Sequence, residues 1–229
     1  MRLRAALFVA LLVAACGGAP GAAGVRAAPS PATAETSGPQ FQGAIERIDA
    51  ELREEMTGVS WHSGCPVPIR RLRLLTLDYW GFDGEVHRGR LIVRRRQAQP
   101  VLGAFHTLFD DSFQIRRVRM IEPYRADDDL LGRKNVTSGF NCRLATGGSN
   151  WSQHAYGLAI DINPVQNPYV NGDVVLPARG RRFLDRSLDE PGMVHADDVV
   201  VQAFADIGWE WGGNWTSIRD YMHFSLTGN

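Results

Sequence analysis

The chain reads Ser152-Gln153-His154-Ala155-Tyr156-Gly157-Leu158-Ala159-Ile160-Asp161 where two ionisable side chains stand among apolar neighbours. Residues 158–163 alternate as a strand does, so the large aliphatic side chains share one face and Asp161 lies on the other. Gly157 allows the chain to turn before this strand, which brings His154 back toward Asp161. Because a buried carboxylate is costly unless it is paired or binds a metal, the stretch predicts a polar site beside a short strand.

A second stretch of this kind, Asp220-Tyr221-Met222-His223-Phe224, follows near the C-terminus. We expect a short final strand here, from which His223 joins His154 and Asp161. Two imidazoles and one carboxylate are a known ligand set for catalytic zinc, with a fourth position open to water. The pattern therefore predicts a zinc site, with one ion per chain, placed to activate water for peptide-bond hydrolysis. Ordinary core histidines and a capping aspartate are the alternative that spacing leaves open.

Asp220 is the candidate catalytic acid/base. A metal ligand is committed to coordination, so a separate carboxylate is needed to take a proton from water and deliver it to the leaving amine. Spacing by itself leaves the reverse roles of Asp161 and Asp220 open. The run Asp127-Asp128-Asp129 is interpreted as a solvated acidic loop, with a weak calcium site as the alternative. Ordinary structural roles are expected for the remaining histidines, which are His62, His87, His106 and His195.

Helical and extended patterns mix along the rest of the chain without a regular βαβ rhythm. Apolar residues at helical spacing predict helices over residues 45–56, 101–109 and 199–207. Extended patterns predict strands over residues 72–76, 91–93, 113–121, 135–140 and 158–163. The fold class expected is α+β, a single domain with a largely antiparallel central sheet flanked by helices.

The charge balance narrows the class of partner. Lys and Arg number 25 and Asp and Glu number 25 among 229 residues, so the formal net charge is zero. Nucleic-acid binding draws on a basic surface that releases counterions, and this composition gives no reason to expect such a partner. No obligate protein partner is implied either.

The N-terminus predicts an exported protein. Two arginines precede an apolar run that ends Val13-Ala14-Ala15-Cys16-Gly17, which indicates a signal peptide over residues 1–15. The cysteine at the cleavage point resembles that of a bacterial lipobox, which implies lipidation of Cys16; an ordinary signal peptide with a chance cysteine is the alternative. Residues 16–40 hold few side chains able to build a core, which is typical of a flexible linker. We therefore expect a membrane-anchored cell-envelope lipoprotein that faces the periplasm or the cell wall.

Two further cysteines, Cys65 and Cys142, belong to the folded part. An oxidising compartment permits a disulfide between them. Two separate thiols remain the alternative, because the sequence does not show whether their Cα atoms approach within bridging distance.

Several motifs between Asn135 and Leu226 resemble the D-alanyl-D-alanine carboxypeptidase and L-alanyl-D-glutamate endopeptidase family of zinc peptidases. The segment over residues 208–215, with D-x-x-H-F after it, is also similar to phage endolysins of that family. The resemblance implies a fold shared with the hedgehog signalling domain and vancomycin-resistance dipeptidases, and cleavage of stem peptides in peptidoglycan. The motifs are Ser138-Gly139-Phe140-Asn141-Cys142-Arg143, S-x-H-x-x-G-x-A-x-D over Ser152 to Asp161, Ile162-Asn163-Pro164, Asn167-Pro168-Tyr169, and D-x-x-H-F from Asp220.

The resemblance also implies roles for single residues. His154, Asp161 and His223 match the zinc ligands, and Asp220 matches the catalytic acid/base. Two substrate contacts are added, because Arg143 matches an arginine that binds or polarises the substrate and Ser152 matches a substrate-contacting serine.

These expectations divide the chain into a signal peptide, a lipidated linker and a zinc peptidase domain over residues 41–229, whose motif-bearing part is 135–226. The lipoprotein signal suggests a host enzyme of wall maintenance, which favours a carboxypeptidase that removes terminal D-alanine. The alternatives are an L-Ala-D-Glu endopeptidase of the same family and a non-catalytic cell-wall-binding domain. The intact ligand set and Asp220 argue against the last.

Overall fold

The structure is a computed structural model that describes residues 38–227. The predicted signal peptide, the predicted lipidation site Cys16 and all but the last three residues of the predicted linker lie outside the described residues. Among residues 38–227, no helix has the length and apolar character that a membrane crossing would require.

Short helices and antiparallel strands alternate irregularly along the described chain, so the predicted α+β class is confirmed. The strands are β1 (Gly43–Glu46), β2 (Leu72–Trp80), β3 (Val86–Arg94), β4 (Ala159–Asp161), β5 (Tyr169–Asn171), β6 (Val174–Leu176), β7 (Glu210–Trp211), β8 (Arg219–Asp220) and β9 (His223–Ser225). The α-helices are α1 (Ala50–Met56), α2 (Ala98–Asp110), α3 (Asp128–Arg133) and α4 (Val199–Asp206). The 3-10 helices are η1 (Ile69–Arg71), η2 (Glu122–Tyr124), η3 (Gln153–Tyr156), η4 (Ala178–Leu184) and η5 (Gly212–Asn214).

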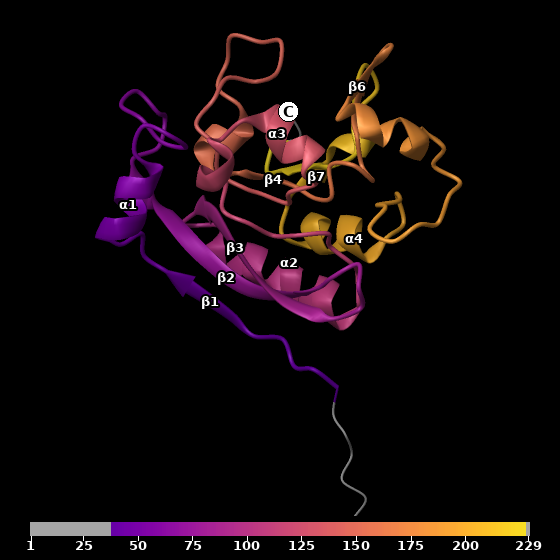
Figure 1. Ribbon diagram of the computed structural model, residues 1–229, viewed down its shortest axis with the longest axis horizontal. Helices are drawn as coiled ribbons and strands as arrows, with labels where there is room; N and C mark the ends of the chain where they lie inside the picture. The colour runs from indigo at the N-terminus through magenta and orange to yellow at the C-terminus, as the bar shows by residue number, and fades with distance from the viewer. Residues whose placement is uncertain (1–37, 228–229) are drawn as a thin grey trace, which may run out of the picture. The chain divides into compact units, whose positions relative to one another are not determined.

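The first sheet has the order β1-β2-β3, and both of its pairings are antiparallel. In β2, Leu75 and Leu77 are fully buried, because helix α2 covers this part of the sheet (Figure 1). The covering face of α2 carries Val101, Phe105 and Leu108, which recur at the spacing of a core-facing helix.

One apolar core connects this sheet to the C-terminal half of the chain. The ring of Phe105 in α2 meets Phe204 in α4 edge-on at 6.2 Å between centroids, and Phe204 stacks on Phe224 in β9 at 4.7 Å. All three rings are buried. Since Phe224 directly follows His223, this packing also holds the backbone that carries a predicted site residue.

The C-terminal half contains two smaller sheets, ordered β4-β9-β7 and β6-β5-β8, in which every pairing is antiparallel. In the first of these, Asp161 of β4 lies opposite His223 of β9. In the second, Tyr169 of β5 lies opposite Asp220 of β8. Two of the predicted zinc ligands are therefore register partners, and the antiparallel character is confirmed for three separate sheets rather than one central sheet.

Three of the predicted elements, one helix and two strands, differ from the structure. The predicted helix over residues 45–56 begins only at Ala50, because Asp49 caps it by accepting a 2.8 Å hydrogen bond from the Leu52 N–H. Its first residues instead pair with β2 as strand β1.

The predicted strands over residues 113–121 and 135–140 contain isolated bridges only, such as Val118 to Thr137. A side chain takes the place of a neighbouring strand here, since the Arg116 N–H donates to Asn163 Oδ1 at 2.8 Å.

Candidate active site

His154 is presented by η3, a single turn that is closed at both ends. Ser152 caps its start, since Ser152 Oγ accepts a 3.2 Å hydrogen bond from the His154 N–H. Gly157 ends the turn with φ at +65°, and a Cβ there would lie 2.6 Å from the backbone nitrogen of Arg94. The turn predicted at Gly157 thus needs glycine both for its left-handed backbone and for the close approach of β3.

Three side chains meet at the start of β9. His154 Nε2 lies 3.2 Å from Asp161 Oδ2 and 3.3 Å from His223 Nδ1, and His223 Nδ1 lies 3.1 Å from Asp161 Oδ1. Both imidazoles are buried. The structure therefore brings together the three residues that the sequence predicts as metal ligands.

The ring of His154 is oriented by the backbone. Its Nδ1 lies 2.7 Å from the carbonyl oxygen of Gly139, so Nδ1 donates and the lone pair of Nε2 faces the cluster. Such a second hydrogen bond sets the tautomer and raises the basicity of a metal-binding histidine. Gly139 must itself be small, because a Cβ there would clash with the carbonyl oxygen of Ile92 on β3.

The donor atoms fit a zinc ion. A tetrahedral ion with bonds of about 2.0–2.1 Å keeps its ligand atoms about 3.3 Å apart, close to the separations found among these three side chains. Two buried polar atoms near them, His223 Nε2 and Asp220 Oδ1, have no hydrogen-bond partner among the described residues. Unpaired polar atoms beside a cavity indicate a site for a polar ligand.

The charges of the site push two carboxyl groups in opposite directions. Burial alone would raise the pKa of Asp161, but the imidazoles of His154 and His223 outweigh it and hold that pKa well below its usual range. Burial raises the pKa of Asp220 to about 7 against the pull of His223, and the charge of Asp161 adds to the rise. Asp161 is therefore suited to bind a cation, whereas Asp220 is suited to exchange a proton near neutral pH.

All six site residues of the folded domain line one cavity of about 700 Å³: Arg143, Ser152, His154, Asp161, Asp220 and His223. Ser152 is buried and caps η3, so its visible contact is with the protein backbone. Arg143 is partly exposed and forms an ion pair with Asp128.

The acidic run over residues 127–129 is exposed, as interpreted, but Asp128 and Asp129 begin helix α3 rather than belong to a loop. Asp127 caps α3 by accepting a hydrogen bond from the Leu130 N–H, and Asp129 pairs with Arg133 in the same helix. Asp128 pairs with Arg143, which lines the cavity. Each of the three carboxylates therefore has a partner, and the N-terminus of a helix also favours negative charge.

Aromatic residues that the sequence reasoning left out of the site also line the cavity. Trp215 lies with its ring centroid 5.5 Å from that of His223, and Trp151 and Tyr169 form further parts of the wall. Tyr169 belongs to the quoted Asn167-Pro168-Tyr169 motif, which was the available signal for it. Trp215 closes the segment over residues 208–215 that resembles phage endolysins, which was the available signal for it, whereas no pattern along the chain distinguishes Trp151 from a core residue.

Cys65 and Cys142 form a disulfide, with their Cα atoms 5.9 Å apart. The bridge joins the loop after α1 to the residue directly before Arg143. His62 lies close to both sulfur atoms, but a disulfide holds no thiolate for a metal, so this group is not a metal site.

The comparisons with known proteins agree with this geometry. Residues 146–226 match the family described as D-alanyl-D-alanine carboxypeptidase. The chain is also 27% identical over 107 residues to the peptidoglycan L-alanyl-D-glutamate endopeptidase CwlK of Bacillus subtilis, and the match covers 46% of this chain and 56% of that protein. No solved structure matches the chain. The resemblance found in the sequence motifs is thereby confirmed, and the family match lies within the segment that carries most of those motifs.

Proposed function

We propose that this chain is a zinc-dependent peptidase that hydrolyses stem peptides of peptidoglycan, and that it removes the terminal D-alanine. The observation that carries the proposal is the cluster of His154 Nε2, Asp161 and His223 Nδ1 beside the proton-exchanging Asp220 in one cavity. When bound, zinc would supply a lowered water pKa and a Lewis acid for the scissile carbonyl.

The protein's own residues would do the rest of the work. Asp220 would accept a proton from the attacking water at a carboxylate oxygen and return it to the leaving amine. Asp161 would stay ionised, and the Gly139 carbonyl would keep His154 in the tautomer that leaves Nε2 free. Trp215 and Tyr169 would exclude bulk water from part of the cavity.

Arg143 offers a binding group for the carboxylate of a carboxypeptidase substrate. It is the only cationic side chain among the described residues that line this cavity, apart from the imidazoles. A guanidinium binds a carboxylate through two parallel hydrogen bonds, and the C-terminal D-alanine of a stem peptide carries such a group. The same Arg143 would exchange Asp128 for the substrate carboxylate.

The second candidate is an L-Ala-D-Glu endopeptidase, which the partial similarity to CwlK favours. Incubation with defined muropeptides, followed by mass spectrometry, separates the two. Loss of one terminal alanine supports the carboxypeptidase, a cut between L-Ala and D-Glu supports the endopeptidase, and an unchanged peptide refutes both.

Metal analysis tests the ligand set independently of the substrate. We expect about one zinc per chain in the unaltered protein and a large loss in His154→Ala. His195→Ala serves as the matched control, because His195 does not line the cavity. Zinc retained at full level in His154→Ala would contradict the assignment.

The N-terminal expectations stay part of the proposal. Lipidation of Cys16 would hold the domain at a cell-envelope membrane, with the predicted linker giving it reach. Cell fractionation of Cys16→Ser, compared with the unaltered protein, tests the anchor. Equal membrane association of the two proteins would refute it.

A further inference from the structure

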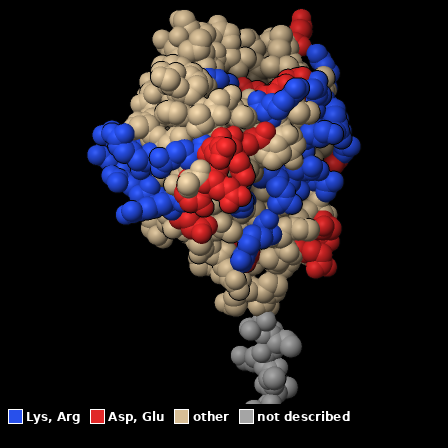
Figure 2. All heavy atoms as spheres, turned by 60° about the vertical axis from the view of Figure 1, so that its left-hand side comes forward, with Lys and Arg blue, Asp and Glu red and all other residues tan. Residues whose placement is uncertain are grey.

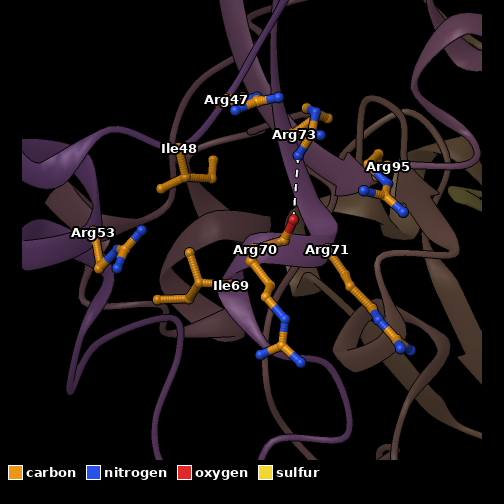
Figure 3. Close-up of a pocket in the computed structure, with 8 residues that line it drawn as sticks. All are labelled: Arg47, Ile48, Arg53, Ile69, Arg70, Arg71, Arg73 and Arg95. Atoms are coloured by element: carbon orange, nitrogen blue, oxygen red, sulfur yellow. Dashed lines mark hydrogen bonds between the residues drawn. The ribbon is translucent and has the colours of Figure 1, made fainter.

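Arginine side chains crowd at one end of the first sheet, away from the residues that line the active-site cavity. They come from the segment between β1 and α1, from α1 and η1, and from the adjoining ends of β2 and β3. We call this group the arginine cluster; it consists of Arg47, Arg53, Arg70, Arg71, Arg73, Arg94, Arg95 and Arg96. Figure 3 shows six of them around a pocket whose centre is flanked by Ile48 and Ile69.

None of these arginines forms an ion pair with another described residue. Other arginines in the described chain do pair with acidic residues, as in Arg88–Asp78 and Arg182–Glu190. In the cluster, Arg73 instead donates to the backbone carbonyl oxygens of Leu72 and Arg70, at 2.7 and 3.3 Å. The described residues therefore give these positive charges no direct ion-pair partner.

The arginines also repel one another. Burial lowers the pKa of Arg73 below its ordinary value, and the charges of Arg95 and Arg47 lower it further. Burial, Arg71 and Arg96 act in the same direction on Arg94. Like charges held this close destabilise the folded protein, and a bound anion would relieve the repulsion.

The cluster encloses hollow space rather than a flat surface. One cavity of about 400 Å³ is lined by Arg47, Arg53, Arg70, Arg71, Arg73 and Arg95 together with Ile48 and Ile69. A second cavity of about 140 Å³ adjoins it, and Arg71 and Arg95 line both. The two isoleucines are nearly buried and offer an apolar wall for the uncharged part of a ligand.

From this arrangement we propose that the arginine cluster binds the phosphate groups of a phosphorylated organic ligand. Guanidinium groups pair with phosphate through planar, bidentate hydrogen bonds. A phosphate carries up to two negative charges and several acceptor oxygens, so it satisfies more of these donors than a single carboxylate does. Ile48 and Ile69 would contact the apolar, organic part of such a ligand.

A discrete ligand fits better than a flat anionic membrane. Figure 2 shows basic side chains on this side of the molecule in two groups, with acidic side chains between them. The exposed residues Glu51, Glu54 and Glu55 of the neighbouring helix α1 are negatively charged. A flat layer of anionic headgroups would meet these charges, whereas a ligand seated in the cavity would avoid them.

Calorimetric titration of the full chain with inorganic pyrophosphate tests the proposal, with acetate as the carboxylate comparator. We expect saturable binding of pyrophosphate that weakens as salt is added, and none of acetate in the same range. The variant Arg70→Gln/Arg71→Gln/Arg95→Gln should bind pyrophosphate at least tenfold more weakly. All three side chains are exposed, so the substitutions spare the core.

A matched triple variant, Arg116→Gln/Arg179→Gln/Arg181→Gln, removes three exposed arginines outside the cluster. It should bind as the unaltered chain does, and both variants should hydrolyse muropeptides normally. Equal losses in the two variants, or the same affinity for acetate as for pyrophosphate, would overturn the proposal. Vesicles of phosphatidylglycerol and of phosphatidylcholine complete the test: selective binding to phosphatidylglycerol without binding of pyrophosphate would assign the cluster to a membrane and also overturn it.

Discussion

The first sheet and the site-bearing sheets are built by different means. Strands β2 and β3 have nine residues each, and helix α2 covers them with a continuous apolar face. The strands that carry the site have only two or three residues: β4, β8 and β9. The first region is held mainly by long hydrogen-bonded ladders and apolar packing, whereas the second shares the apolar core but has only short ladders and needs further support.

Buried side-chain amides supply that support. Asn167 is fully buried and donates to the carbonyl oxygens of Ile162 and Gly192, while its Oδ1 accepts from the N–H of Val194. Asn163 in the same way donates to Gly192 and accepts from Arg116. The site region thus adds individual polar contacts to its apolar packing, whereas the first sheet distributes its stability over many apolar contacts.

The largest effect is expected from Asp220→Asn, which should lower the catalytic rate without changing metal binding in the site region. The amide keeps the shape but accepts no proton, so kcat should fall by about 10²–10⁴-fold while zinc content stays unchanged. Muropeptide hydrolysis and metal analysis measure the two effects. Asp173→Asn, an exposed position, is the control, and turnover near the normal rate in Asp220→Asn would remove Asp220 from the reaction.

Asn167→Ala should show how much stability rests on one amide. It leaves buried backbone groups without partners, each worth about 1–3 kcal/mol, so the free energy of unfolding should fall by about 3 kcal/mol or more. Denaturant unfolding measures this. Asn171→Ala removes an exposed amide and should change stability by less than about 0.5 kcal/mol. Similar small losses in both variants would contradict the difference between the two regions.

Replacing both Cys65 and Cys142 by serine should destabilise the protein by about 2–4 kcal/mol. The disulfide closes a loop with a sequence separation of 77 residues and so restricts the unfolded chain. Thermal unfolding with and without reductant measures the effect in the unaltered protein. A double-serine variant as stable as the oxidised protein would show that the bridge contributes nothing.

The metal-free protein should lose stability as pH rises from about 4 toward 7. The pKa of Asp220 is raised to about 7, so the folded protein holds a proton there that the unfolded chain has released. The slope for one such group is at most about 1.4 kcal/mol per pH unit. Asp161, whose pKa is lowered, acts oppositely, since its contribution is lost only in stronger acid.

Chemical denaturation after treatment with a chelator, at several pH values, measures this dependence. Asp220→Asn should flatten the decline between pH 4 and 7, because the amide does not titrate. An equal decline in that variant would assign the pH dependence to other groups.

The smallest effect is expected in helix α2, where a substitution should raise rather than lower the stability of the protein. Gly103 is an exposed residue within α2, and a Cβ there would meet no atom within 4 Å. Gly103→Ala should therefore stabilise the protein by about 0.5–1 kcal/mol, because alanine loses less backbone entropy in a helix. Gly139→Ala, which clashes with β3 beneath the site, should destabilise it in the same thermal-unfolding assay. A stabilising Gly139→Ala would show that the site region is as tolerant as the helix.

Local patterns were sufficient for much of the fold. The periodicity of residues 101–109 and 199–207 predicts α2 and α4, since helical spacing of apolar side chains depends on neighbours in the chain. The pattern over residues 113–121 wrongly predicted a strand, because the side chain of Asn163 accepts a backbone hydrogen bond there in place of a partner strand. Such a contact joins positions far apart in the chain, so no local pattern reports it.

Residue types and motifs were enough to identify the candidate site residues, because His154, Asp161, Asp220 and His223 stand in recognisable motifs with the chemistry that a peptidase requires. Contacts between distant segments place the three donor atoms 3.1–3.3 Å apart, and burial by those segments raises the pKa of Asp220 to about 7. The same kind of contact brings arginines from separate segments together at one end of a sheet, although the net charge of the whole chain is zero. The reason is physical: residue type sets what a side chain can do, whereas packing between distant segments sets its neighbours and the solvent around it.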